Sequence, residues 1–269
     1  MAFEPFIRWA GGKSWLVPHL ERLIRPVEIR HYHEPFLGGG AIFFNIDHTL
    51  RAYLSDSNEE LINAYTCVRN NPEAVIEIVQ GYQNIAEDYY RVRALAPNNE
   101  NERAARFIFL NQTSYNGLYR VNQMGQYNVP FGDRQLWQFD PEKIRLASQR
   151  LRNTNIRTCD FEGNKYKIQA HDLVFLDPPY TVSHNQNGFI KYNRNLFSID
   201  DQRRLSRFID YIKRKDAYYI LTNAAHQTIA DIFEKGDRRL ELQRASLIGG
   251  RQARRGPVAE YIFTNIPGD

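Results

Sequence analysis

Cysteine is scarce in this chain of 269 residues, which contains only Cys67 and Cys159. Two cysteines cannot build a disulfide framework, and the sequence has neither a Cys-x-x-Cys pair nor a cluster of cysteine and histidine. We therefore expect a reducing, cytoplasmic environment and no bound metal.

Long hydrophobic runs are also missing. No apolar segment approaches the roughly 18 residues that a membrane-spanning helix needs, and the segment 41–46 is far too short. The first residues carry Glu4 and lack the basic-then-apolar layout of a secretory signal. The sequence thus predicts a protein without a membrane segment.

A strong excess of one charge sign is absent as well. Lys and Arg number 35 against 31 Asp and Glu, which gives a net charge of +4. This mild excess permits a polyanionic partner such as nucleic acid without requiring one. Hydrophobic residues make up 42% of the chain and charged residues 25%, values typical of a folded domain, so wholesale disorder is excluded.

The sequence does contain an alternation of short apolar segments and amphipathic segments, which is typical of an α/β fold. Strands are predicted at 31–34, 53–56, 155–160, 173–176, 218–221, 240–247 and 259–264. Helices are predicted after Asn58, Asp140 and Ser198, because these residue types cap helix N-termini. The strand 31–34, the glycine turn 38–40 and a helix over the apolar run 41–44 form the first half of a predicted βαβ unit.

The stretch between the second strand and Asp140 departs from this alternation. Residues 58–115 have a helical pattern, and residues 119–122 and 126–129 then form a predicted β-hairpin around a glycine loop. We therefore predict a domain made of residues 1–56 and 140–269, interrupted by a mainly helical subdomain, 57–139, that bears the hairpin.

The segment Asp177-Pro178-Pro179-Tyr180 directly follows an apolar strand, at the edge where open α/β sheets bind their ligands. The exocyclic amine of adenine or cytosine is a poor nucleophile because its lone pair is delocalised into the ring. The Asp177 carboxylate and the Pro178 carbonyl can accept its two N–H bonds, and proline fixes the backbone that holds this acceptor. Tyr180 offers a flat face on which a flipped-out base can stack.

The glycine turn lacks the spacing of a dinucleotide site and has no phosphate-binding lysine. Its glycines let the backbone approach a ligand, and Asp56, at the end of the next strand, is placed to bind ribose hydroxyls. Asp160-Phe161 ends a further strand and is a second candidate for donor contact. These residues alone do not distinguish NAD from S-adenosylmethionine, and Asp56 could equally serve as a helix cap.

Together these motifs resemble the Dam family of DNA adenine-N6 methyltransferases, of the D12 class, along almost the whole chain and in the family's order. The resemblance rests on RWAGGK at 8–13, EPFLGGGAIFF at 34–44, YNGLYRVNQMGQYNVPFG at 115–132 and DPPY at 177–180. It implies a Rossmann-like sheet of the S-adenosylmethionine-dependent methyltransferases, and a target-recognition subdomain that contains the hairpin.

The resemblance also implies roles for particular residues. Contacts to S-adenosylmethionine are expected from Trp9, Lys13, Glu34, Phe36, Gly38, Asp56, Asp160, Phe161 and Asp177. The catalytic residues would be Asp177, Pro178, Pro179 and Tyr180. Contacts to DNA are expected from Arg8, Tyr115, Asn116, Leu118, Arg120, Asn122 and Pro130. Asp133 stands where relatives often continue with basic residues, so further phosphate contacts would come from elsewhere. The candidates are Arg134, Arg251, Arg254, Arg255, Arg145, Arg150, Arg152 and Arg157.

The resemblance therefore implies an enzyme that methylates N6 of a flipped-out adenine in double-stranded DNA, with GATC as the site, and a monomer as the family expectation. The alternatives are methylation of cytosine N4 or of an RNA adenine, an NAD-dependent oxidoreductase, and a DNA-binding regulator without catalysis. The hairpin argues against RNA, because the A-form major groove is too narrow to read. The motifs do not distinguish a role in restriction from one in mismatch repair or in a phage.

Overall fold

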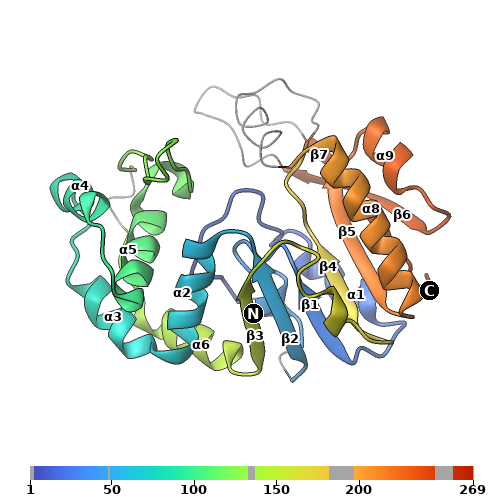
Figure 1. The fold of residues 1–269 in the computed structure, drawn as a ribbon, viewed down its shortest axis with the longest axis horizontal. Helices are drawn as coiled ribbons and strands as arrows, with labels where there is room; N and C mark the ends of the chain where they lie inside the picture. The colour runs from blue at the N-terminus through green and yellow to red at the C-terminus, as the bar shows by residue number, and fades with distance from the viewer. Residues whose placement is uncertain (1–2, 48, 133–136, 182–196, 246–256, 269) are drawn as a thin grey trace. The chain divides into compact units, whose positions relative to one another are not determined.

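The computed structural model describes residues 3–47, 49–132, 137–181, 197–245 and 257–268. Their strands form a seven-stranded sheet in the order β3-β2-β1-β4-β5-β7-β6, which confirms the α/β class (Figure 1). The chain divides into two compact units. Unit 1 comprises Met1–Val17 and Leu37–Asp160, and unit 2 comprises Pro18–Phe36 and Phe161–Asp269. The predicted insertion at 57–139 stays a prediction.

Unit 2 contains the strand that precedes the DPPY segment, residues 177–180. Strands β1 (His31–Glu34), β4 (Leu173–Leu176) and β5 (Tyr218–Ala224) are parallel. β7 (Pro257–Thr264) pairs antiparallel with β5, and β6 (Arg238–Ala245) pairs antiparallel with β7. All four residues of β4 are buried, as expected for a parallel strand that is covered on both faces.

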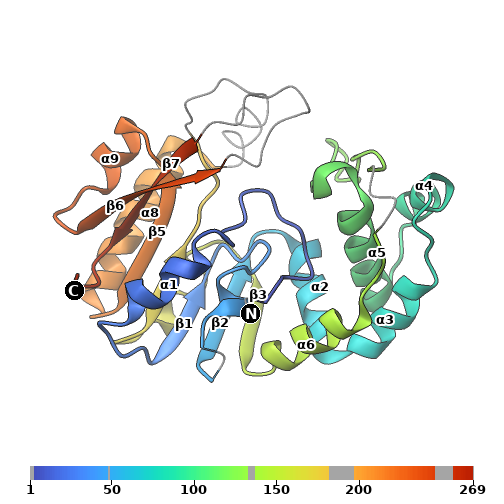
Figure 2. The ribbon, with the colours of Figure 1, turned by 180° about the vertical axis from the view of Figure 1, so that it is seen from behind.

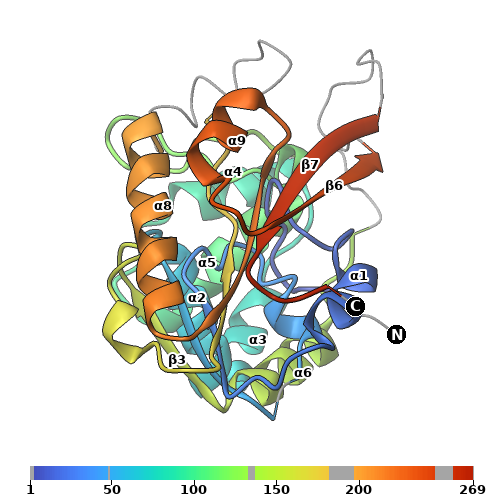
Figure 3. The same ribbon diagram turned by 90° about the vertical axis from the view of Figure 1, so that its right-hand side faces the viewer.

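Helices cover both faces of these strands. α8 (Ile199–Arg214) and α1 (Val17–Ile24) lie on opposite faces, as Figures 1 and 2 show. Ser198 and Asp201 form the predicted capping box at the start of α8, each side chain accepting from the other's backbone N–H. Figure 3 shows α9 (Gln227–Phe233) beside α8 and next to the antiparallel pair β6 and β7.

Unit 1 contains the parallel strands β2 (Arg51–Asp56) and β3 (Thr154–Thr158). Its α-helices in the described residues are α2 (Glu59–Asn70), α3 (Pro72–Gln80), α4 (Ala86–Ala94), α5 (Glu100–Thr113) and α6 (Pro141–Leu151). The predicted caps are confirmed, because Asn58 accepts from a backbone N–H of α2 and Asp140 from two of α6.

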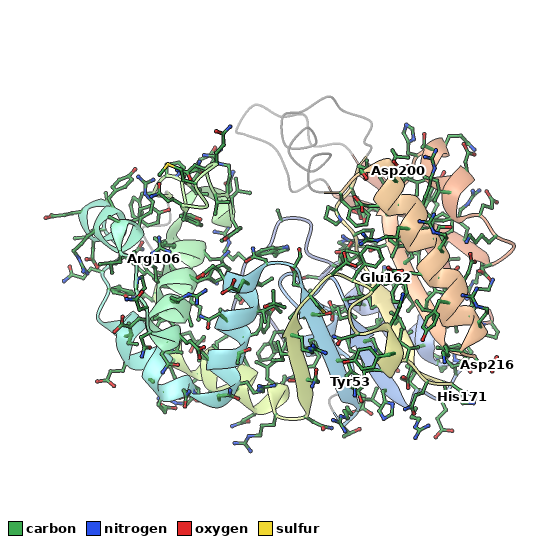
Figure 4. The ribbon with its side chains drawn as sticks, in the orientation of Figure 1. Tyr53, Arg106, Glu162, His171, Asp200 and Asp216 are labelled. Atoms are coloured by element: carbon green, nitrogen blue, oxygen red, sulfur yellow. The ribbon has the colours of Figure 1, made fainter. Side chains whose placement is uncertain are left out.

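Helices α4 and α5 form the base on which the hairpin segment, residues 115–132, is built. Arg106 of α5, labelled in Figure 4, donates from Nε to the Val92 carbonyl (3.1 Å) and from Nη2 to the Arg93 carbonyl (2.7 Å). Side chains of both helices and of the hairpin segment share one buried cluster, which contains Tyr89, Val92, Phe109, Leu110, Tyr127 and Val129. This shared cluster fixes the hairpin segment to the helices.

The predicted hairpin is present, but its two arms are joined by isolated β-bridges and are too short to form β-strands. A single antiparallel bridge joins Val121 to Tyr127, and a second joins Ser114 to Phe131. Between them the backbone N–H of Asn128 donates to the carbonyl of Arg120 at 3.0 Å. Pro130 has no N–H to extend the ladder, which is a physical reason for the short pairing.

Two other expectations are corrected. The apolar run 41–44 does not form an α-helix, because the segment contains only the short 3₁₀ helix η1 (Phe43–Asn45). The Asn45 side-chain amide donates to the carbonyls of Ala41 and Phe3, at 2.9 and 3.0 Å. The Ala41 carbonyl, which a helix would pair with a backbone N–H, is thus bonded to a side chain. β3 ends at Thr158, two residues before the predicted end of that strand, whereas β5 continues three residues beyond Leu221.

Three further observations concern the described residues only. No helix among them is long and apolar enough to cross a membrane. They contain no group of three His, Cys, Asp or Glu side chains arranged to hold a metal ion. Of the arginines proposed for additional phosphate contacts, Arg134, Arg251, Arg254 and Arg255 lie outside the described residues. Arg145 donates to Glu73 and Arg150 to the Phe44 carbonyl, whereas Arg152 and Arg157 are exposed, and their contacts with phosphate stay predictions.

Candidate functional site

The glycine turn of unit 1 brings Trp9, Gly38 and Asp56 together. Gly38 has a φ of +48°, and a Cβ at this position would lie 2.6 Å from Cδ1 of the Trp9 indole. Only glycine therefore fits between this backbone and the indole ring. The backbone N–H of Gly38 donates to Oδ2 of Asp56 at 3.1 Å, which joins the turn to the end of β2.

Asp56 lies two residues before Asn58, which is the N-cap of α2, and the predicted contact of Asp56 with ribose hydroxyls stays a prediction. Its Oδ1 accepts from the backbone N–H of Asn58 at 3.0 Å, as a residue at a helix start does. Burial raises the pKa of the Asp56 carboxyl, although backbone N–H groups of Asn58, Gly38 and Ser57 act in the opposite direction. A carboxylate has about four acceptor positions, so Asp56 retains capacity for a ligand hydroxyl.

The RWAGGK segment lies against the hairpin segment within unit 1. The Trp9 and Tyr119 rings are stacked, with centroids 6.0 Å apart and planes 23° apart. The Arg8 guanidinium lies so close to Gly117, whose φ is +63°, that a Cβ there would be 2.7 Å from the Arg8 Cζ. The Lys13 side chain is buried and donates to the Gly11 carbonyl at 2.7 Å.

Polar side chains from three other elements hold the DPPY segment in unit 2. Thr222 of β5 donates from Oγ1 to Oδ1 of Asp177 at 2.8 Å. The Tyr180 hydroxyl donates to Oε2 of Glu260, on β7, at 2.5 Å. Gln202 of α8 donates from Nε2 to the Pro179 carbonyl at 3.4 Å. The carboxylate, one carbonyl and the ring of this segment thus each have a fixed partner.

An aromatic group accompanies the predicted donor residues of unit 2. Phe36 and Phe161 are stacked, with centroids 5.3 Å apart and planes 25° apart. The Arg204 guanidinium lies 4.2 Å from the centroid of the Phe161 ring. Glu34 is buried, and its Oε2 accepts from the Tyr32 hydroxyl at 2.7 Å. The structure therefore pairs Phe36 with Phe161, whereas Asp160 is an exposed residue at the end of the unit 1 segment.

Arg120 is exposed on the hairpin segment and is braced by Asn128 across the turn. Its Nε donates to Oδ1 of Asn128 at 2.7 Å, and its Nη2 donates to the Asn128 carbonyl at 3.3 Å. A guanidinium has five N–H donors, so Arg120 retains donors for a ligand. The Asn128 contacts therefore orient the planar group without using up its hydrogen-bonding capacity.

Asn122 has a local structural role in the same turn. Its Oδ1 accepts from the backbone N–H groups of Met124 (3.0 Å) and Gln126 (2.9 Å), and its Nδ2 donates to Gln126 Oε1 at 3.1 Å. The amide thus shapes the glycine loop, and its predicted contact with a base stays a prediction.

The remaining predicted DNA contacts lie at the other end of the hairpin segment. Tyr115 is 48% exposed, and Asn116 is exposed with a φ of 56°, a left-handed conformation that asparagine tolerates. Leu118 packs against the buried cluster of α4 and α5, and the exposed Pro130 accepts from the Tyr115 N–H through its carbonyl at 3.0 Å. Tyr115 thus combines an exposed ring with an anchored backbone.

Sequence reasoning did not identify four residues that the structure places beside the predicted ones. They are Thr222, Gln202 and Glu260, around the DPPY segment, and Asn128, beside Arg120. One usable signal was present for Glu260, because an acidic residue in the apolar run 259–264 is unusual for a buried strand. The others depend on which elements pair, and no local pattern reports that.

Comparison with known proteins gives a consistent result. The family model for the D12 class N6 adenine-specific DNA methyltransferase matches residues 9–246. The Type II methyltransferase M1.LlaDCHI of Lactococcus lactis subsp. cremoris is 34% identical over 274 residues, which cover 97% of this chain and 95% of the relative.

Two further relatives come from other organisms. The Type II methyltransferase M.MjaIII of Methanocaldococcus jannaschii is 34% identical over 249 residues, covering 83% of this chain and 85% of the relative. The DNA adenine methylase of Haemophilus influenzae is 29% identical over 268 residues, covering 96% of this chain and 92% of the relative. The similarity therefore extends over nearly the full length of both partners, not over one motif.

Proposed function

Because the chain belongs to the D12 class of N6 adenine-specific DNA methyltransferases, we propose that it methylates an adenine flipped out of double-stranded GATC with S-adenosylmethionine as the donor. The class itself decides against an NAD-dependent oxidoreductase, a cytosine-N4 or RNA methyltransferase and a non-catalytic regulator. The observation that carries the proposal is the Asp177 carboxylate at the end of β4, oriented by Thr222 and followed by Pro178, Pro179 and Tyr180.

We propose contacts to the donor from residues of each unit, namely the glycine turn of unit 1 and the stacked aromatic pair of unit 2. The Asp56 carboxylate would accept hydrogen bonds from ribose hydroxyls, as acids after the second strand of such sheets do. Trp9, Phe36 and Phe161 supply aromatic surface, and Glu34, Lys13 and Asp160 supply polar groups. The chemistry of this residue set fits a nucleoside that also carries charged groups. When bound, S-adenosylmethionine supplies a methyl group activated by its sulfonium.

In the chemical step that we propose, the residues of the DPPY segment have different roles. The Asp177 carboxylate and the Pro178 carbonyl accept the two N–H bonds of adenine N6, which draws the nitrogen towards a tetrahedral, nucleophilic geometry. With the donor bound, N6 would form a bond to the methyl carbon as the carbon–sulfur bond breaks, leaving a neutral thioether. The proton that N6 loses would pass to the Asp177 carboxylate and from there to water. Tyr180 stacks on the extruded base, since an aromatic face replaces the stacking that the base loses on leaving the duplex.

Recognition of the sequence is assigned to the hairpin segment. Arg120 would donate two hydrogen bonds to O6 and N7 of a guanine in the major groove. Leu118 and Pro130 would provide apolar contacts, the latter with a thymine methyl, and Tyr115 would insert into the base stack. Arg8 would reach the target site from the RWAGGK segment. DNA adenine methylases among the relatives support an adenine target for these contacts.

The proposal is tested by incubating the protein with methyl-tritiated S-adenosylmethionine and duplex DNA from a host without adenine methylation. After digestion to nucleosides, the label is expected in N6-methyladenine. Label in N4-methylcytosine, or label in a parallel incubation with RNA but not in the one with DNA, would contradict it. Asp177→Ala is the negative control, and a duplex without GATC is the specificity control.

A further inference from the structure

Glu260 is a fully buried acidic residue in the middle of β7, with 0% of its surface exposed. Its backbone is opposite Ala224 of β5 and Leu242 of β6. A buried carboxyl group is costly unless it is hydrogen-bonded, and Ile262 and Phe263 show that apolar side chains are accommodated further along the same strand. The burial of this carboxyl group therefore requires an explanation beyond packing.

The group that Glu260 binds belongs to the DPPY segment. The Tyr180 hydroxyl donates to Oε2 of Glu260 at 2.5 Å, a short bond of the kind that carboxylates form with hydroxyl groups. The two residues are 80 positions apart in the sequence and lie in the same unit. The bond thus links β7 to the end of the segment that follows β4.

The bond restrains a motion that the prolines cannot restrain. Pro178 and Pro179 fix their own φ angles, but the Tyr180 ring can rotate about its two side-chain torsions. The ring is attached to the backbone at one end and to Glu260 at the other, so rotation about χ1 is restrained and the ring keeps its position before a base arrives. Rotation about χ2 leaves the hydroxyl in place, so the bond sets where the ring lies and not the angle of its plane. A preformed stacking surface costs less conformational entropy on binding than a mobile ring.

We propose that Glu260 is a positioning residue that holds the Tyr180 ring as a preformed stacking surface for the extruded adenine. This role rests on the proposed function, since it presumes that Tyr180 stacks on the base. Glu260 itself is buried, and in this role it acts through the tyrosine hydroxyl.

Four variants and a control test the role. Tyr180→Phe keeps the ring and removes the hydroxyl, Glu260→Leu removes the acceptor, and Glu260→Gln keeps an acceptor oxygen. The double variant Tyr180→Phe with Glu260→Leu measures the coupling between the two residues. Glu241→Leu, on the exposed side of β6, is the matched control for loss of one acidic residue from the same pair of strands.

Each variant is assayed for kcat, for the KM of DNA and of S-adenosylmethionine, and for the fluorescence of 2-aminopurine placed at the target adenine. The fluorescence of 2-aminopurine rises when the base leaves the duplex and falls when the base stacks on an aromatic ring. Its intensity therefore reports whether the extruded base is stacked on Tyr180. We expect Tyr180→Phe and Glu260→Leu each to lower kcat/KM for DNA about tenfold and to change the fluorescence, with the KM for the donor unchanged. Glu260→Gln should recover most of the loss.

The coupling between the Tyr180 and Glu260 substitutions decides whether Glu260 acts through Tyr180. The double variant should lose no more than either single variant, because both remove the same bond. Additive losses, or a Tyr180→Phe enzyme with wild-type kcat/KM and fluorescence, would overturn the positioning role. If Glu260→Leu does not fold, Tyr180→Phe and Glu260→Gln still decide. Failure of the proposed function can be distinguished from failure of the positioning role, because the wild-type protein would then form no N6-methyladenine.

Discussion

The DPPY segment of unit 2 and the hairpin segment of unit 1 are stabilised in different ways. The Asp177 and Tyr180 side chains bind partners 45 and 80 residues later in the chain, and both partners are buried. The side chains of Arg120 and Asn122 bind partners eight and four residues away, in exposed positions. The side chains proposed for the chemistry are thus held by long-range buried contacts, whereas those proposed for recognition are oriented by local contacts at the surface.

The difference follows from what each region must do. A carboxylate that activates N6 must be fixed to within a fraction of an ångström, which packed elements can achieve. A hairpin that enters a groove must leave its donors accessible, so only local contacts are available to orient them. We therefore expect changes in the two regions to affect different kinetic constants.

The largest effect is expected for Asp177→Ala. Removing the acceptor for the N6 protons should lower kcat about 10²-fold or more on every duplex. Single-turnover methylation, with donor affinity measured separately by equilibrium binding, checks the prediction. A variant that keeps nearly wild-type kcat would contradict the role of the DPPY segment.

Asp56→Asn tests the donor side of unit 1. The amide retains an oxygen for the Gly38 N–H but loses the negative charge and one acceptor pair, so the KM for S-adenosylmethionine should rise about tenfold. Trp9→Ala should act in the same direction, but Trp9 also stacks on Tyr119 of the hairpin segment, so only Asp56→Asn should leave DNA binding unaltered. Steady-state kinetics with each substrate varied in turn measures both constants. Weakened DNA binding with an unchanged donor KM would show that this site is misassigned.

Arg120→Ala is expected to change specificity more than affinity. Loss of one bidentate contact should cost about 1–3 kcal/mol of discrimination at a single guanine. The measurement is the ratio of kcat/KM on GATC and on single-base variants at two salt concentrations. Arg91→Ala, which removes an exposed arginine from α4, is the control for charge alone. A uniform loss on all duplexes would indicate a phosphate contact instead.

A smaller effect of the same kind is expected for Asn128. Asn128→Ala removes the acceptor for Arg120 Nε, so the discrimination ratio should fall by about fivefold or less. Asn128→Asp keeps an acceptor and should preserve that ratio, even though its negative charge weakens binding to all duplexes. Equal discrimination ratios for wild type and Asn128→Ala would show that the hydrogen bond to Asn128 does not contribute to discrimination by Arg120.

The smallest effect concerns stability and lies in unit 2. His31 and His33 bind the two carboxylate oxygens of the buried Asp172, each at 2.9 Å. Burial lowers the pKa of His33, although Asp172 opposes the shift. Burial raises the pKa of Asp172, but hydrogen bonds from His33 and the Gln169 N–H outweigh it and lower the pKa overall.

The sign for His33 follows from proton binding. As pH falls through about 6.5, the unfolded chain binds a proton at this histidine before the folded protein does. Stability should therefore decrease between pH 7.5 and pH 5.5, with a fall of a few degrees in Tm, and the loss due to Asp172 should follow only at more acidic pH. His33→Gln should flatten this dependence, whereas the exposed His19→Gln should leave it intact. A wild-type Tm that rises on acidification would contradict the assignment.

Much of the fold could be predicted because local patterns determine it. The caps at Asn58, Asp140 and Ser198 and the buried strand 173–176 were predicted from residue type and spacing, and the structure confirms them. The apolar run 41–44 was misjudged, since the hydrogen bonds of Asn45 at this turn are not visible in a hydrophobic pattern.

The motifs of the candidate site could be predicted from the sequence, but the residues that hydrogen-bond to those motifs could not. Glycine turns and the DPPY segment are contiguous in sequence, so their chemistry can be read directly. Glu260 and Thr222 reach that segment only because β5 pairs with β4 and β7 pairs with β5. Such pairing depends on the whole sheet, and therefore no short window of the sequence contains it.

The most direct test is a map of modified adenines in the genome of a methylation-free host that expresses the chain or its Arg120→Ala variant. The account predicts that wild type modifies adenine N6 in GATC, and that the variant also modifies sites altered at the guanine contacted by Arg120. Asp177→Ala should leave the genome unmodified. A wild-type map with another motif, or identical maps for wild type and Arg120→Ala, would contradict the assignment of recognition to the hairpin segment.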